Sequence, residues 1–582
     1  MQHQPVAELK SDAGAESSIV RLVRASQTPL VARGEPFVWA LGSALALGIA
    51  MIVGFLVLVL WNGLVTFWPK PVALVTTTAG KLVAGEPTRI EAYRPSSDSI
   101  ANLSADLQSA IRGRNGYADR TLYRIGNYDL YNEDFRWLSD FEKASVAYPK
   151  DLLFAERLEW GVFVGTLKAA QIGGETLDRP NPRDPKLIAA HREARSRWRE
   201  IRHIERNLIG RVNYNIDQLR LAVRRAEIRY GASSPQVASA RAEEARQLPS
   251  LKAEYDRLAA AAQALKTKDQ AINVTLAEVG GREKVLPLSA LVRFYPANDL
   301  SLAEKIGIYG SRWWEFVSDE PREANTEGGV LPAIFGTVAM TLLLVLIVTP
   351  FGVITALYLR EYARQGRLVS VVRISVNNLA GVPSIVYGVF GLGFFAYTLG
   401  AGIDELFFPE RLPNPTFGTG GVLWAALTLA LLTVPVVIVA TEEALSAVPR
   451  SMREGSLACG ASKWQTIRHI VLPRALPGIM TGIILAMARG AGEVAPLMLV
   501  GVVKLAPTLP IDSYFPFIHL ERSFMHLGFH IYDVGFQSRN SEAGKPMVFV
   551  TTALLITVIA VLNLTAILLR ARLKRRFVGS QF

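Results

Sequence analysis

Six apolar runs, each about as long as a membrane is thick, alternate with polar segments along the chain. A helix of about 20 predominantly apolar residues crosses the hydrocarbon core of a bilayer. The runs lie at residues 38–60, 330–359, 375–399, 421–440, 476–503 and 547–569. The pattern predicts an all-α polytopic membrane protein with six transmembrane helices.

The charges that flank these runs predict their orientation. Basic residues concentrate in the N-terminal tail (1–37), in the 360–374 and 441–475 loops and in the C-terminal "RARLKRR". Lys and Arg favour the cytoplasmic side, so both termini are expected there. The run 38–60 is long and lacks a clear A-x-A site, which favours a retained first helix over a cleaved signal peptide.

This orientation leaves residues 61–329 outside the cytoplasm as one large insert, expected to form a periplasmic domain. Short stretches such as "RIEAY" and "EWGVFVGTL", separated by turn residues, predict strands. Apolar residues then recur every three or four positions at 201–223 and again at 248–265. We expect a mixed α/β domain with a helical hairpin at about 185–275. The hairpin could be a docking arm for a partner, or a helix pair that packs on its own domain.

Composition excludes several classes of function. Half of the 582 residues are hydrophobic and the net charge is +12, an excess typical of cytoplasmic loops in a membrane protein. Cys459 is the single cysteine, so disulfides within the chain and cysteine metal sites are excluded. The sequence contains no HExxH pair and no GxxxxGK[ST] phosphate loop. We therefore expect no metal, no cofactor and no ATPase site of its own.

One membrane-length stretch carries two charges. Arg489 and Glu493 are the only charged residues between positions 475 and 503. Two central charges cost about 5–7 kcal/mol on insertion scales. The eleven Leu, Ile and Val residues of the stretch return about 3–7 kcal/mol. The span is marginal by itself, and such charges are candidates for function. The pair could serve transport, or it could be a structural ion pair.

The loop 441–475 is predicted to form two short helices. The first should cover 452–458 and end at Gly460, because glycine accepts a left-handed turn. The second should begin at Ser462, whose side chain can cap it, and should stop at Pro473. Exposed Trp464 and Ile467 would suit insertion into a groove of another protein.

This loop resembles the coupling loop of permease subunits in bacterial ABC importers, which has the form E-A-A-x3-G-x9-I-x-L-P. Gly455 and Ser456 replace the two alanines, a mild departure. The positions that match are Glu454, Gly460, Ile470, Leu472 and Pro473.

Two further stretches narrow the resemblance to one family. "NNLAGVPSIVYGVFGLGFF" (377–395) and "ARGAGEVAPLMLVG" (488–501) are similar to the A-type permease subunit of the high-affinity phosphate (Pst) importer. The resemblance covers about 330–576, and the large insert resembles an N-terminal extension found in some members.

The resemblance implies a type I ABC importer permease fold in the bacterial inner membrane. It implies a dimer of ATP-binding subunits seated on the coupling loop, a second permease subunit in a heterodimer and a periplasmic phosphate-binding protein. Nucleic-acid binding is not expected.

It also implies a phosphate pathway at Arg489 and Glu493. An arginine fork binds two phosphate oxygens, and Glu493 would keep the anion from being held too tightly, because conduction requires release. Ser384 and Tyr387 are secondary candidates, because Pro383 could break the helix there, as in transporter sites; a simple kink is the alternative.

Two other functions stay open at this point. The substrate could be another oxyanion, such as sulfate or molybdate. The chain could instead be a membrane-anchored sensor that uses the external domain, although its C-terminal tail is too short for an output domain.

Overall fold

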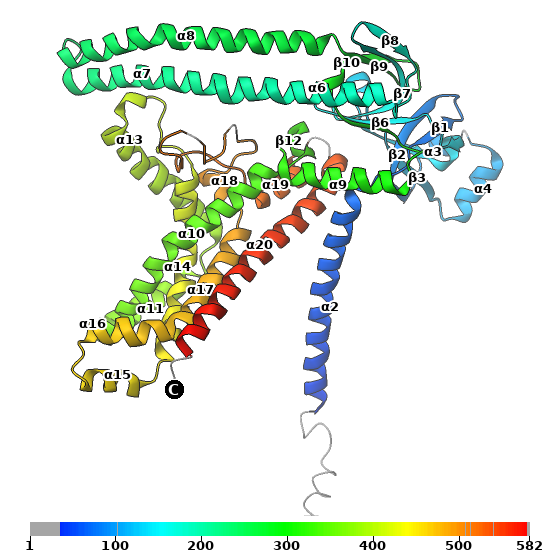
Figure 1. Ribbon diagram of the computed structural model, residues 1–582. Coiled ribbons are helices and arrows are strands. Elements are labelled where there is room, and N and C mark those ends of the chain that lie inside the picture. Colours follow the sequence, from blue (N-terminus) through cyan, green and yellow to red (C-terminus); the bar gives the residue numbers. More distant parts are fainter. Residues whose placement is uncertain (1–34, 102, 507, 513, 539–540, 579–582) are drawn as a thin grey trace, which may run out of the picture. The chain divides into compact units, whose positions relative to one another are not determined.

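The computed structural model describes residues 35–101, 103–506, 508–512, 514–538 and 541–578 (Figure 1). The chain falls into two compact units, one up to Asn62 and one from Gly63 onward. The first unit contains most of α2 (Glu35–Thr66), an apolar helix of 32 residues. Most of the expected N-terminal tail lies outside the described residues.

Two antiparallel sheets follow α2 in the chain. Their strand orders are β4-β3-β2-β1-β5 and β10-β9-β7-β6-β11, with β8 paired to β7. The strands of the first sheet are β1 (Ala73–Thr77), β2 (Leu82–Tyr93), β3 (Ala118–Arg124), β4 (Phe135–Ser139) and β5 (Lys143–Ala147). Those of the second are β6 (Leu153–Arg157), β7 (Val162–Ile172), β8 (Glu175–Asp178), β9 (Asn273–Ala277), β10 (Glu283–Pro287) and β11 (Leu291–Pro296).

Strand β6 is buried along its whole length because both faces of the second sheet are covered. On one face Ala155 and Phe163 share a core with Leu187 of α6 (Pro185–His203). On the other face Phe154 packs with Val72 and Ala84. Short elements complete this region: α3 (Ser97–Ala101), α4 (Ala105–Gly113), α5 (Tyr128–Tyr131), β12 (Pro321–Arg322) and β13 (Glu327–Gly328).

Two long helices, here called the arm, are inserted between β8 and β9. α6 continues through a π-helical turn (Ile204–Leu208) into α7 (Ile209–Tyr230). After a turn at Gly231, Ser234 caps α8 (Pro235–Gln270) by accepting a hydrogen bond from the Val237 amide. Buried Ile204, Val212, Leu258 and Ala262 pack α7 and α8 along each other.

Helix α9 (Leu302–Ser318) leads to a bundle of long apolar helices. Six helices of the described chain are long and apolar enough to cross a membrane: Phe37–Thr66, Leu331–Tyr362, Ser384–Phe407, Val422–Ser446, Lys463–Gly492 and Ser541–Arg575. This confirms the prediction of six apolar helices. The labelled segments of the bundle are α10 (Leu331–Leu357), α11 (Arg367–Leu379), α12 (Ser384–Phe390), α13 (Ala401–Phe407), α14 (Val422–Ser446), α17 (Leu472–Gly492) and α20 (Ser541–Val578).

Helices α10, α14 and α17 form the centre of the bundle (Figure 1). A Cβ atom added at Gly478 or Gly482 would lie 2.5 Å from the side chain of Ala444 or Ala440, respectively. Only glycine allows α17 to approach α14 this closely, as in other membrane helix pairs.

The boundaries of two expected spans were wrong. The run 375–399 is broken: α11 ends at Leu379 and the span starts at Ser384, because Pro383 disfavours helical backbone before it. The run 476–503 is shifted, since its helix starts at Lys463 and ends at Gly492.

The helix was also expected to stop at Pro473, and it does not. α16 (Lys463–Thr466), a π-helical turn (Ile467–Val471) and α17 are continuous. Pro473 lies inside this continuous helix, directly after the π-helical turn, an irregularity that is found inside α-helices. Ile467, expected to be exposed, is buried because this turn contacts α15 (Arg450–Ala458).

Candidate functional site

Arg489 and Glu493 lie at the end of a helix and not in its middle. α17 ends at Gly492, and Glu493 has extended backbone. The guanidinium Nε of Arg489 is 3.6 Å from Glu493 Oε1, and the two side chains are 36% and 24% exposed. The pair is therefore charge-compensated but loosely held, and open on one side.

The break after α17 meets the break before α12. Gly388 of α12 lies so close to Pro496 that an added Cβ would be 2.7 Å from its Cα. Two helix ends and one loosely paired cation thus share a region, an arrangement typical of transporter sites.

The secondary candidates differ in their contacts. Tyr387 is buried, and its hydroxyl donates a hydrogen bond of 2.6 Å to the carbonyl of Leu379. That bond closes the gap between α11 and α12. Ser384 is half-buried at the first position of α12, one turn before Tyr387.

Two glycines near the charged pair differ in their surroundings. A Cβ at Gly490 would be 2.2 Å from the Leu344 side chain of α10, whereas a Cβ at Gly492 would meet nothing within 4 Å. The Gly490 side of the α17 end therefore packs against α10, whereas the Gly492 side is open within 4 Å.

The 441–475 loop has the local structure that its sequence predicts at the turn. Gly460 has φ +83°, and the Ser462 side chain accepts a hydrogen bond from the Gln465 amide. The Ser456 hydroxyl, which stands at a family alanine position, lies 2.9 Å from that of Thr466 and ties the two helices together. Trp464 is exposed.

The loop is fastened to the end of the α10 span. Arg453 forms an ion pair of 3.1 Å with Glu361 and donates a hydrogen bond of 2.6 Å to the Leu445 carbonyl. Lys463 also donates to the Glu361 carbonyl. A force on the loop would therefore be transmitted to two spans.

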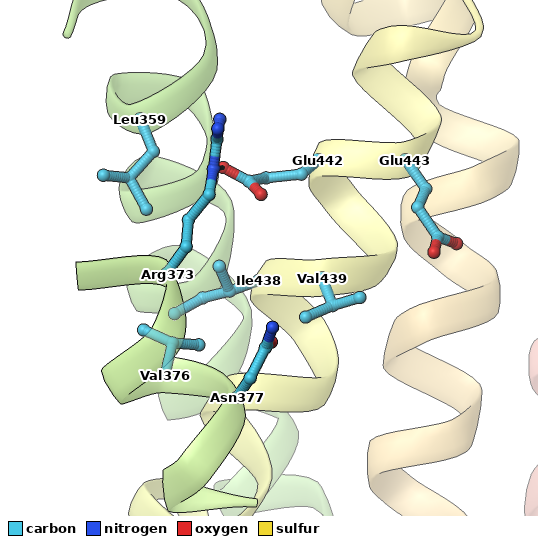
Figure 2. A pocket seen from close by; sticks show the side chains of 8 residues that line it. All are labelled: Leu359, Arg373, Val376, Asn377, Ile438, Val439, Glu442 and Glu443. Atoms are coloured by element: carbon cyan, nitrogen blue, oxygen red, sulfur yellow. Dashed lines mark hydrogen bonds and ion pairs between the residues drawn. The ribbon is translucent and has the colours of Figure 1, made fainter. Parts of the chain in front are cut away.

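A pocket of about 200 Å³ lies between α11 and α14 (Figure 2). Figure 2 shows Arg373 extending from α11 toward Glu442 of α14, with Glu443 directed away from them. The Arg373 Nε to Glu442 Oε1 distance is 3.2 Å. Sequence reasoning did not find this pair; the available signal was a basic residue and an acidic residue at the ends of two apolar segments.

Comparisons with known proteins fit this architecture. Residues 348–579 match the family described as binding-protein-dependent transport system inner membrane component, the permease class of ABC importers. The chain is 35% identical to the phosphate transport system permease protein PstA 1 of Mycobacterium tuberculosis (strain CDC 1551 / Oshkosh) over 267 residues, which are 46% of this chain and 78% of the relative. The chain belongs to this family of PstA permease proteins.

With other relatives, the match covers a smaller share of the relative's length. The PstA protein of Yersinia pestis is 39% identical over 192 residues, 33% of this chain and 59% of that protein. The probable ABC transporter permease protein YqgH of Bacillus subtilis (strain 168) is 35% identical over 196 residues, again 33% and 59%. A solved structure of the MetNI methionine ABC transporter covers 42% of this chain and 95% of its own, at 19% identity and a TM-score of 0.31. The family match begins at residue 348, so the sheets and the arm lie outside it.

Proposed function

We propose that the chain is the permease subunit of an ATP-driven importer that moves inorganic phosphate across the bacterial inner membrane. The observation that carries the proposal is membership of the PstA family together with Arg489 at the meeting point of two helix breaks. An arginine fork suits a phosphate ion. Glu493, which lies 3.6 Å from Arg489, would weaken the arginine's hold on phosphate enough for the ion to be released.

The coupling loop would receive the ATP-binding subunits. Exposed Trp464, the capped turn at Ser462 and the link from Arg453 to Glu361 support this role. Glu454, Gly460, Ile470, Leu472 and Pro473 would form the coupling motif. A second permease would complete the pathway on the open side of Arg489. If the loop is the dock, Trp464→Asp should abolish co-purification of the ATPase, and normal co-purification would contradict the assignment.

Residues 61–329 would lie in the periplasm, as the positive-inside rule suggests. There the arm would act on two loops between spans. Arg225 Nε donates to Glu410 Oε1 at 2.9 Å, and the Glu410 side chain is 0% exposed. The Tyr214 and Tyr514 rings are 4.6 Å apart. We propose that the domain modulates docking of the phosphate-binding protein; unchanged uptake kinetics after deletion of residues 80–320 would contradict this role.

Transport itself is tested by uptake of labelled phosphate into cells whose phosphate permease is replaced by this chain with its partner subunits. Uptake should depend on the chain, and excess unlabelled sulfate or molybdate should not compete. Competition by either anion would show that the pathway also accepts that oxyanion and is not selective for phosphate. No uptake with the complex assembled would contradict the transport proposal.

A further inference from the structure

Helix α9 turns charged residues toward the protein and leaves apolar residues exposed, the reverse of a usual surface helix. Of its four charged residues, Arg312 and Glu315 turn toward the protein, Glu304 pairs with Arg183 and Lys305 is half-buried. Arg312 Nε donates a hydrogen bond of 2.8 Å to Glu156, and Glu315 accepts one of 2.9 Å from Arg293. A surface helix of a domain in water normally presents such residues to the solvent.

The exposed face of α9 is apolar. Leu302, Ile306 and Trp314 are 67%, 55% and 72% exposed and follow one another at intervals of four and eight residues, so they share one face. The other exposed positions of this described helix are alanine, glycine or serine, and none carries a charge. Water does not favour a stripe of this kind, so another phase or another molecule is expected to cover it.

The position of α9 in the fold identifies what covers it. Phe67, directly after α2, contacts Trp313 edge to face at 5.1 Å, and Trp68 lies 5.7 Å from Tyr309. Three residues after Trp313, Phe316 also contacts Phe67 and shares a core with Val330, immediately before α10.

The start of the last span, α20, joins the same core through Met547 and Val550. The C-terminal part of α9 is thus packed beside the starts of two spans, α10 and α20. Trp and Tyr concentrate at the membrane–water boundary in membrane proteins.

We infer that α9 lies in the outer lipid–water interface, with Leu302, Ile306 and Trp314 inserted among the lipids. A helix of this kind buries its apolar face roughly 5–10 Å into the boundary between headgroups and acyl chains. Because Arg312 is paired inward and Lys305 is the single lysine of α9, contact with lipid depends more on apolar burial than on anionic headgroups. α9 thereby fixes the sheets and the arm at a constant height above the bilayer.

Site-directed fluorescence in the reconstituted complex tests this inference. Cys459→Ser removes the natural thiol, and Ile306→Cys then carries an environment-sensitive fluorophore. Ser233→Cys, in the exposed turn between α7 and α8, is the matched control. Phosphatidylcholine vesicles contain a lipid with a nitroxide quencher either near the headgroup or at the end of the acyl chain.

The label at Ile306 should lose fluorescence with the shallow quencher and much less with the deep one, and the label at Ser233 should lose none. The loss should change little when anionic lipid is added. A label at Ile306 that is shielded from water but insensitive to both quenchers would mean that a protein covers α9, and a water-exposed label would mean that nothing does. Either result overturns the inference. Leu302→Cys, on the same face, repeats the test independently of Ile306.

Discussion

Replacement of Arg489 by alanine is expected to slow phosphate uptake strongly without unfolding the chain. The Arg489 to Glu493 distance of 3.6 Å and the 36% exposure of the arginine mean that the ion pair adds only about 0.2–1 kcal/mol to stability. In contrast, one hydrogen bond between a charged group and phosphate contributes roughly 1.5–3 kcal/mol. Since 1.36 kcal/mol corresponds to a factor of ten in rate, loss of one such bond lowers uptake about 10–150-fold.

The assay is the initial rate of labelled phosphate uptake, divided by the amount of chain in the membrane. Arg489→Lys keeps the charge but loses the planar fork, so its rate should lie between wild type and alanine. Arg572→Ala, which removes the same charge from an exposed position near the end of α20, is the control and should transport normally. If Arg489→Ala inserts fully and keeps the wild-type rate, Arg489 is not part of the pathway.

Three further predictions concern other charged groups. Glu493→Gln should let Arg489 hold phosphate more tightly, which lowers both the half-saturating concentration and the maximal uptake rate; an unchanged pair of values would exclude its role in release. Arg225→Ala leaves the buried Glu410 carboxylate unpaired and should destabilise the 408–421 loop by about 1–3 kcal/mol, seen as faster hydrogen exchange there, whereas exposed Arg229→Ala should cause no change. Burial disfavours the charged Glu156 carboxyl, but the Arg312 and Arg293 guanidinium groups outweigh it and lower its pKa from 4.5 to about 2. Its contribution to stability is therefore complete above pH 4.5 and is lost as the pH falls toward 2. Thermal unfolding of the isolated chain should show this loss, and Glu156→Gln should flatten it; equal acid sensitivity of both proteins would contradict the assignment.

Much of the local structure could be predicted from the sequence, because its causes are local. The six apolar helices follow from runs of hydrophobic residues, since every backbone polar group in lipid must be paired within its own helix. The turn at Gly460 and the cap at Ser462 follow from the intrinsic preferences of glycine and serine. The prediction that the helix stops at Pro473 was wrong, because the effect of a proline on a helix depends on where in the helix it lies.

The candidate site could be predicted only in part. The sequence singled out Arg489 and Glu493 because charged residues in an apolar stretch raise the free energy of membrane insertion. It also indicated a helix break near Pro383. It could not show that this break meets the one after Gly492, because residues about one hundred positions apart are brought together by tertiary packing alone. The Arg373–Glu442 pair was missed for the same reason.

The sequence by itself determined the membrane class, the number of apolar helices, the family and the residues that form the turn at Gly460, because these depend on composition, periodicity and short spacing. Only the tertiary structure decided that Arg489 lies at a helix end with one open side, that Arg225 reaches a buried glutamate and that α9 turns its apolar face outward. The physical reason is that the spacing of hydrophobic residues specifies which of them share a helix face. What that face packs against depends on contacts between distant parts of the chain.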